Sequence, residues 1–167
     1  MLAPLRERAD LTIDTSELSI GDLRRILQGH VGPRRSACAS IAVTSFSYRQ
    51  GLPREADLVL DARFLNNPHY DEALRPLSGR DPAVAAFLEA DHGFAAFHAS
   101  LSELLTILLP RFEREGKSYL TIAVGCTGGR HRSVFVAEKL GAYIRAGGRE
   151  AFVHHRDLDR RGGGEEY

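Results

Sequence analysis

The spacing of hydrophobic positions alternates along the chain between continuous runs, typical of buried strands, and the helical repeat of about 3.6 residues. The clearest run is YLTIAVGC (119–126), which is apolar on both faces, as expected of a strand inside a parallel sheet. The stretch that follows places its apolar residues, from Val134 to Ile144, at helical spacing. This part of the chain therefore predicts a strand followed by a helix over 130–146.

The same reading assigns the rest of the chain. Further strands are expected at 10–14, 38–46, 56–63 and 148–156. Further helices are expected at 15–29, 82–90 and 93–109, with Pro110 kinking or ending the last of them. A linker is expected at 29–36 and a long irregular loop at 64–82. Strands alternating with helices predict an α/β domain, with a mostly parallel sheet flanked by helices and a ligand site at the carboxyl ends of the strands.

The segment between the strand 119–126 and its helix has the composition of an anion-binding loop. It reads CTGGRHRS (Cys126–Ser133), the C-x5-R-S spacing of a cysteine phosphatase loop. The N–H groups and the dipole at a helix N-terminus attract negative charge, and the glycine pair lets the backbone approach an oxyanion and permits positive φ. Arg132 offers a bidentate guanidinium and Ser133 a hydroxyl. His131 can donate a hydrogen bond or titrate near neutral pH.

Two interpretations of Cys126 follow. A cysteine among helix N–H groups and an arginine is activated as a nucleophile, which favours a phosphatase. Gly125, however, stands where that class usually has a histidine, and the general acid such a reaction needs is not singled out by the sequence. The candidates for that acid are Asp61, Asp71 and Asp81. The alternative is a packed thiol at the end of a buried strand, in a loop that holds an anion without reacting with it.

A second polar cluster follows the strand 56–63. DARFLNNPHY gathers Asp61, Arg63, Asn67 and His69, whose carboxylate, guanidinium, amide and imidazole suit a ligand that carries both hydroxyls and charge. The alternative is a surface Asp–Arg ion pair with Asx turns before a proline. Neither H-x-x-x-H nor C-x-x-C occurs in the chain, so we expect no metal site.

Composition narrows the function classes. The chain has 167 residues, enough for one domain with one core, and Lys plus Arg and Asp plus Glu both number 22. A formal net charge of zero argues against strong nucleic-acid binding by the domain as a whole. The two cysteines are too few for a disulfide framework. We expect a cytoplasmic setting without a membrane span, because the apolar runs fall short of about 20 residues and no signal peptide is visible.

Two stretches, SFSYRQGLPREADLVLDARFLNNPHYDEALRPLSGRDPAVAAFL and SYLTIAVGCTGGRHRSVFVAEKL, closely resemble the C-terminal domain of the RapZ/YvcJ family. The most specific parts are RHRSV and DARFLNNPH. Members of that family join a P-loop nucleotide-binding domain to this C-terminal domain. The resemblance divides the chain into the last strand and helix of the N-terminal domain (1–32), the RapZ-like domain (37–158) and a flexible tail (159–167).

The resemblance also implies a function. A studied member of the family is an RNase adapter that binds a small regulatory RNA, delivers it to an endoribonuclease and senses glucosamine-6-phosphate through this domain. The implied partners are thus a phosphorylated amino sugar, a small RNA or an RNase, and a second copy of the chain, with no cofactor in this part of the protein. The implied phosphate-binding residues are Thr127, Gly128, Gly129, His131, Arg132 and Ser133. The implied sugar-binding residues are Asp61, Arg63, Asn67 and His69.

Three functional hypotheses stay open. The first is a non-catalytic regulatory domain that senses the amino sugar phosphate. The second is an enzyme, a phosphatase or sugar-phosphate transferase that uses Cys126. The third is a module for oligomerisation and RNA docking. RNA-binding members carry a basic C-terminal tail, whereas here arginines are offset by acids: Arg156, Arg160 and Arg161 by Asp157, Asp159, Glu165 and Glu166.

Overall fold

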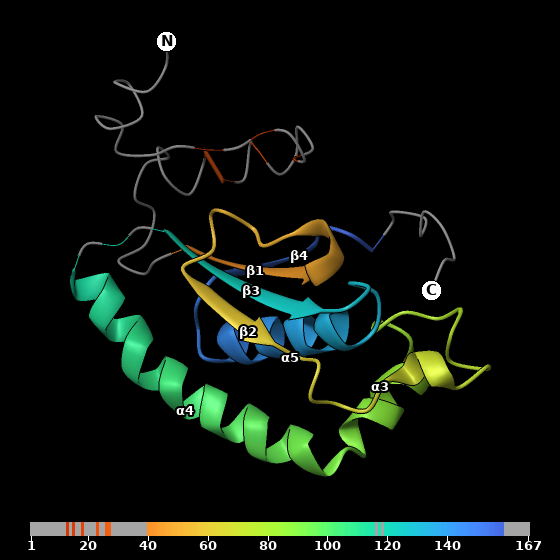
Figure 1. Ribbon diagram of the computed structural model, residues 1–167. Helices are drawn as coiled ribbons and strands as arrows, with labels where there is room; N and C mark the ends of the chain where they lie inside the picture. Colours follow the sequence, from red (N-terminus) through yellow and green to blue (C-terminus); the bar gives the residue numbers. More distant parts are fainter. Residues whose placement is uncertain are drawn as a thin grey trace.

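The fold is known from a computed structural model that describes residues 40–115, 117 and 119–158, together with Ile13, Thr15, Leu18, Leu23, Ile26 and Leu27. Its centre is a four-stranded sheet in the order β2-β3-β1-β4 (Figure 1). The strands are β1 (Ser40–Ser47), β2 (Leu58–Asp61), β3 (Tyr119–Cys126) and β4 (Ala151–His155). Every neighbouring pair is parallel, which confirms the α/β class expected from the sequence.

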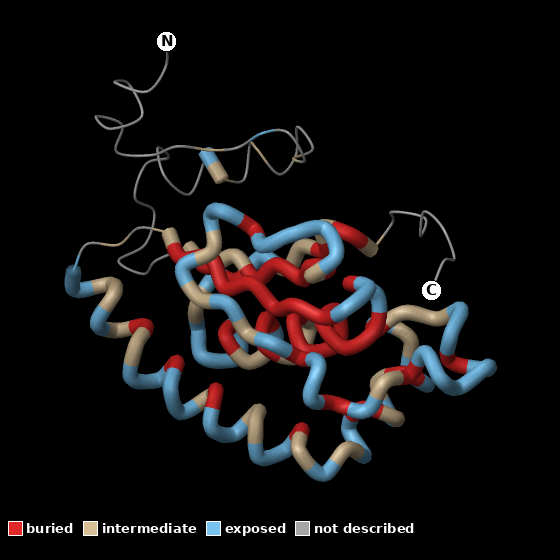
Figure 2. The backbone as a smooth tube through the Cα atoms, in the orientation of Figure 1, coloured by how far each residue is buried: buried red, intermediate tan, exposed pale blue. Residues whose placement is uncertain are grey.

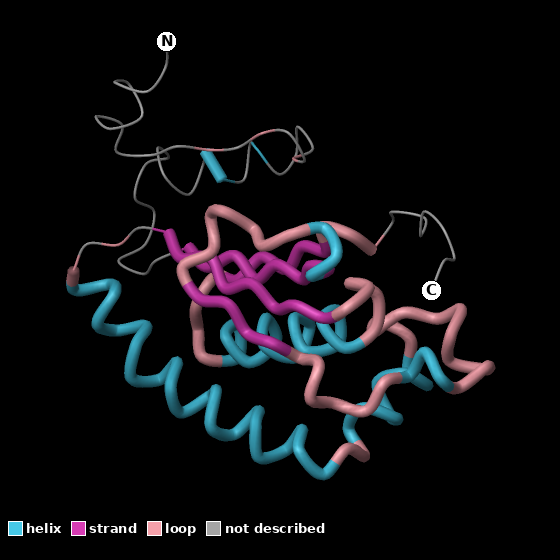
Figure 3. The backbone as a smooth tube through the Cα atoms, in the orientation of Figure 1, coloured by secondary structure: helices cyan, strands magenta, loops and turns pink. Residues whose placement is uncertain are grey.

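The register of the sheet brings the carboxyl ends of the strands to one edge. The last residue of β1, Ser47, pairs with Cys126 at the end of β3. At the two sides, Asp61 pairs with Gly125 and His155 pairs with Ser45. The segments that follow the strands therefore leave the sheet together, and Figures 1 and 3 show them gathered at the same end of the molecule.

Helix α5 (Arg132–Ala146) packs against one face of the sheet and is buried over most of its length (Figure 2). All the inward positions expected from the helical spacing are buried, from Val134 to Ile144. Of these, Ala137, Leu140 and Ile144 join the β1 residues Ile41 and Val43 in the hydrophobic core. Alternation along a strand turns the intervening residues of β1 to the opposite face of the sheet.

Two more helices complete the helical layer, α3 (Pro82–Glu89) and α4 (His92–Arg114). Pro82 occupies the first turn of α3, as expected, where its missing N–H costs nothing. The ring of Phe94 lies 4.8 Å from that of Phe135 on α5. The core residues of α4 are Phe94, Leu101, Leu105 and Leu109.

The expected end of this helix at residue 109 is wrong, because α4 continues to Arg114 with Pro110 inside it. The kink expected as the alternative at Pro110 stays a prediction. An interior proline costs about 3 kcal/mol. Contacts of the last turn offset that cost, since Phe112 packs against the core and Glu113 pairs with Arg149 at 2.9 Å. By length and composition alone α4 is also apolar enough to cross a membrane, which is a weak indication for a helix that packs Leu101, Leu105 and Leu109 into the core.

The remaining element boundaries agree with the sequence to within a few residues. The expected loop 64–82 contains one short 3-10 turn, Pro68–Tyr70. Most of the expected strand 10–14 and helix 15–29 lies outside the described residues. The expected linker 29–36 and tail 159–167 lie wholly outside them, so these assignments and the division at residue 32 stay predictions.

A substitution at Gly141 tests the packing of α5 against β4. A methyl group at this position would overlap the Cγ2 atom of Val153. We expect Gly141→Ala to lower the free energy of unfolding by about 1–3 kcal/mol through overpacking, although alanine forms helix better than glycine by about 1 kcal/mol. Urea denaturation measures the change. Gly93→Ala in the first turn of α4 is the matched control, and equal losses in both variants would contradict the prediction.

Candidate functional site

The loop between β3 and α5 has the backbone geometry of an anion cradle. β3 ends at Cys126 and α5 begins at Arg132, and His131 at the N-cap position makes no side-chain capping bond. The first N–H groups of the helix therefore point toward the loop without a cap from that residue. Gly129 has a φ of 69°, which favours glycine, whereas Gly128 does not share the positive φ.

Close packing behind the loop makes glycine necessary at position 129. A Cβ atom on Gly129 would lie 3.0 Å from the backbone nitrogen of Ser47 and 3.2 Å from the Cβ of Asp157. The Ser47 hydroxyl donates to the carbonyl oxygen of Thr127 at 2.7 Å. The end of β1 and the residue that follows β4 thus support the cradle from behind.

Arg132 is buried, and it ties the cradle to the segment after β2. Its Nη1 donates to the carbonyl oxygens of Arg63 at 2.9 Å and Leu65 at 3.2 Å. Its Nη2 lies 3.5 Å from the hydroxyl of Thr127. Arg132 therefore joins the two sequence clusters into one site, and part of its fork holds the protein backbone.

Cys126 closes the strand side of the cradle. Its side chain is 3 % exposed, and its Sγ lies 3.1 Å from the hydroxyl of Ser133. Ser133 is itself fully buried. The burial of the thiol agrees with the interpretation of Cys126 as a packed thiol. The neighbouring Ser133 hydroxyl is also compatible with the phosphatase interpretation.

Asp61 and Arg63 form an exposed ion pair at the rim of the cradle. The guanidinium contacts both carboxylate oxygens, and the shortest contact joins Nη2 to Oδ2 at 2.6 Å. This hydrogen bonding holds the pKa of Asp61 below its usual value, with Arg132 adding a weaker effect of the same sign. Arg63 also stacks over the ring of Tyr48, 4.1 Å from its centroid.

Tyr48 anchors this rim to the sheet. Its ring packs where Gly125 has no side chain, because a Cβ there would collide with Tyr48 and Phe46. Burial raises the pKa of the Tyr48 hydroxyl, and the negative charge of Asp61 raises it further. The tyrosine therefore remains protonated at neutral pH and presents a neutral surface for the stacked guanidinium.

Asn67 and His69 lie on the loop that follows the rim, whereas His131 lies at the N-cap position of α5. The side-chain oxygen of Asn67 accepts from the backbone N–H of His69 at 3.4 Å, which is the Asx turn considered as the alternative for this segment. His131 is 7 % exposed, and its Nε2 has no partner among the described residues. Burial lowers the pKa of His131, partly offset by backbone groups of Arg75, and the charges of Arg130 and His69 lower it too.

Sequence reasoning missed the supporting role of three groups. Ser47 has no role in the sequence-based prediction, which places Arg156 and Asp157 in a tail where arginines are offset by acids. The structure corrects that interpretation, because Asp157 is 4 % exposed and its Oδ2 accepts from the Ser47 N–H at 2.7 Å. No local pattern marks these residues, and only the pairing of β1 with both β3 and β4 reveals their proximity.

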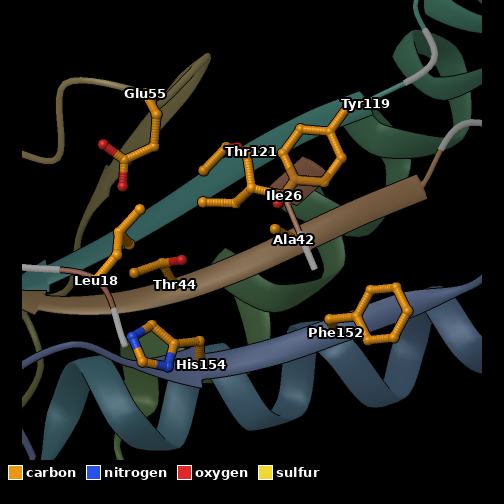
Figure 4. Close-up of a pocket in the computed structure, with 9 residues that line it drawn as sticks. All are labelled: Leu18, Ile26, Ala42, Thr44, Glu55, Tyr119, Thr121, Phe152 and His154. Atoms are coloured by element: carbon orange, nitrogen blue, oxygen red, sulfur yellow. The ribbon is translucent and has the colours of Figure 1, made fainter. Parts of the chain in front are cut away.

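A pocket on the opposite face of the sheet does not coincide with this site. Ala42 and Thr44 line it, and they alternate with core residues of β1. Leu18 and Ile26 line it from the N-terminal segment, and Phe152 lines it from β4 (Figure 4). Its lining is mostly apolar, so it does not have the chemistry of an anion site.

A polar chain crosses from the sheet to α5 and begins at two buried residues, Ser45 and His155. His155 Nδ1 lies 2.8 Å from the Ser45 hydroxyl, and its Nε2 lies 3.0 Å from Glu138 Oε1. Arg80 donates to the same Glu138 oxygen at 3.1 Å. Burial lowers the pKa of His155, against the opposing effect of Glu138. Burial alone would raise the pKa of Glu138, but hydrogen bonds from His155 and Arg80 hold it below its usual value.

The fold and the loop define an all-parallel α/β domain with a glycine loop and a helix N-terminus at the carboxyl edge of its sheet. The family model described as the RapZ C-terminal domain matches residues 39–159, and the chain belongs to this family. This agrees with the resemblance carried by the RHRSV and DARFLNNPH segments.

Curated relatives match nearly the whole chain. A nucleotide-binding protein of Paramagnetospirillum magneticum is 56% identical over 162 residues, covering 97% of this chain and 53% of the relative. One of Rhodospirillum centenum is 56% identical over 161 residues, covering 96% and 48%. One of Gluconobacter oxydans is 47% identical over 166 residues, covering 97% and 51%. The chain therefore spans about half the length of these relatives.

The two buried histidines predict a pH dependence of stability. The pKa values of His131 and His155 lie below the usual value in the folded state, so between the folded and unfolded pKa values the unfolded chain binds more protons. The free energy of unfolding should fall as the pH drops below about 6.5, the usual pKa of histidine. His155→Gln should reduce this slope in urea titrations between about pH 5 and 7. Exposed His92→Gln is the control, and an unchanged slope in His155→Gln would reject the assignment.

Proposed function

We propose that this domain binds a phosphorylated amino sugar of the glucosamine-6-phosphate type without reacting with it, and that this binding regulates the contact of the protein with an RNA or protein partner. The observation that carries the proposal is the joining of a glycine loop at a helix N-terminus to the Asp61–Arg63 rim through Arg132. The cradle suits a phosphate and the rim suits a charged sugar, at a separation that one side chain bridges.

The phosphate end uses backbone N–H groups at Gly128 and Gly129 and the hydroxyl of Thr127. Arg132 makes three hydrogen bonds within the described part of the chain, out of the five N–H donors of a guanidinium. Two donors therefore remain for a phosphate oxygen. His131 and the backbone of Ser133 belong to the same helix start, where the dipole favours an anion.

The sugar end uses Asp61, Arg63, Asn67 and His69. An ammonium group of the ligand requires a carboxylate, and Asp61 is the carboxylate at the rim. Its ion pair with Arg63 is exposed, and pairs of that kind contribute about 0–1 kcal/mol. A ligand ammonium can therefore replace the Arg63 guanidinium at Asp61 at a small cost in free energy. The guanidinium is then available for a hydroxyl or phosphate oxygen of the ligand.

The regulatory part of the proposal rests on family membership. The relatives are named nucleotide-binding proteins and are about twice as long as this chain, so their nucleotide site belongs to the proposal for the whole protein. A small RNA or an RNase, and a second copy of the chain, are the proposed partners. The zero net charge makes a local basic surface, and not the domain as a whole, the proposed RNA contact.

Calorimetric titration tests the ligand. We expect saturable binding of glucosamine-6-phosphate and weaker binding of glucose-6-phosphate, because the latter has no ammonium for Asp61. Asp61→Asn should weaken binding of the amino sugar about tenfold and leave that of glucose-6-phosphate nearly unchanged, while Thr127→Val should weaken both by a similar factor. Glu103→Gln on the exposed face of α4 is the control. No binding of either sugar phosphate at millimolar concentration would reject the proposal.

A cysteine phosphatase is the second candidate, and the Cys126–Ser133 contact favours it, because a hydroxyl next to the sulfur can stabilise a thiolate. The burial of the thiol opposes it. We expect Cys126→Ser to retain binding of glucosamine-6-phosphate, and the unmodified protein to leave an aryl phosphate intact in a spectrophotometric assay. Turnover that disappears in Cys126→Ser would replace the binding proposal with this one.

A further inference from the structure

Asp157 is a buried carboxylate directly behind the anion cradle. It follows β4 by two residues and is 4 % exposed. Its Oδ2 accepts a 2.7 Å hydrogen bond from the backbone N–H of Ser47. Its Cβ lies 3.2 Å from the position that a Cβ atom on Gly129 would take. Asp157 thus contacts the two elements that define the back of the loop.

The contacts of Asp157 continue into the loop itself. Ser47 uses its backbone N–H for Asp157 and its hydroxyl for the carbonyl oxygen of Thr127. The same hydroxyl accepts from the N–H of Arg49, so its orientation is set from two sides. Asp157 is therefore connected to Thr127 in the loop through one residue, Ser47.

A carboxylate at this place requires compensation, because an unpaired negative charge would repel an anion in the adjacent cradle. Arg156 supplies it, since its Nε and Nη2 contact the carboxylate at 2.9 to 3.2 Å. The Nη2 atom also donates to the carbonyl oxygens of Ser47 and Gly51, and the guanidinium lies 5.5 Å from the centroid of Phe46. The pair is consequently fastened to the turn after β1.

We propose that Asp157, neutralised by Arg156, is a positioning residue that holds the 127–129 loop in its anion-binding shape through Ser47. The inference rests on the proposed function of that loop and assigns Asp157 no contact with the ligand.

Two substitutions of Asp157 separate positioning from stability. Asp157→Ala removes the acceptor for Ser47, whereas Asp157→Asn keeps an oxygen in the same place. We expect Asp157→Ala to weaken binding of both inorganic phosphate and glucosamine-6-phosphate about tenfold or more, as loss of the outer partners of metal ligands does. Asp157→Asn should restore most of the affinity. Arg149→Ala, which breaks the pair with Glu113 before β4 begins, is the control for a general loss of stability.

A second readout does not need a ligand. Hydrogen exchange followed by mass spectrometry should show faster exchange at 127–131 in Asp157→Ala than in Arg149→Ala, at matched fractions of folded protein. Ser47→Ala, which removes only the hydroxyl bond to Thr127, should give an intermediate increase and serves if Asp157→Ala does not fold. The inference is overturned if hydrogen exchange in the loop is unchanged in Asp157→Ala. If Asp157→Ala does not fold, unchanged exchange in Ser47→Ala overturns it instead. Unchanged phosphate affinity in a folded Asp157→Ala would also overturn it.

The two proposals fail in different ways. If the unmodified protein binds neither phosphate nor the sugar phosphate, the proposed function is rejected and loop exchange alone decides the role of Asp157. If the unmodified protein binds and Asp157→Ala binds equally well, the proposed function stands and the positioning role is rejected.

Discussion

The parallel register of β1 with β3 is the constraint on which the candidate site depends. It sets Ser47 beside Cys126, from where the serine hydroxyl reaches the carbonyl oxygen of Thr127. Pairing of β4 on the other side of β1 then delivers Asp157 to the Ser47 backbone. A slip of one residue would turn these side chains to the opposite face of the sheet and leave the loop without its support.

Charge at this edge is arranged in local pairs. Asp61 is paired with Arg63, and Asp157 with Arg156. Arg132 differs from these two arginines, because it is buried and its three hydrogen bonds to described residues go to oxygens without formal charge. Burying a charge is costly unless it is compensated. The buried guanidinium therefore favours a negatively charged ligand near the loop. The zero net charge of the chain conceals this local positive charge.

Local patterns predicted much of the fold. The buried run of β3 and the helical spacing of α5 were read correctly because each element buries a face that its own periodicity displays. The helix end at residue 109 was predicted too early, since the cost of Pro110 is offset by packing of Phe112, which no local pattern predicts. Leu104 also fits the helical spacing of α4 and is nevertheless 44% exposed, because that spacing does not say how wide the buried stripe is.

The sequence by itself determined the class of fold, the helix start at the glycine loop and the two polar clusters, because hydrophobic period, glycine and helix N-terminal chemistry act over a few neighbouring residues. Only the tertiary structure decided that Arg132 joins those clusters and that Asp157 belongs behind the loop. The Ser47–Asp157 bond spans 110 positions of the chain. Such a contact forms only after the sheet has set its strand order and register, and no property of either residue alone encodes it.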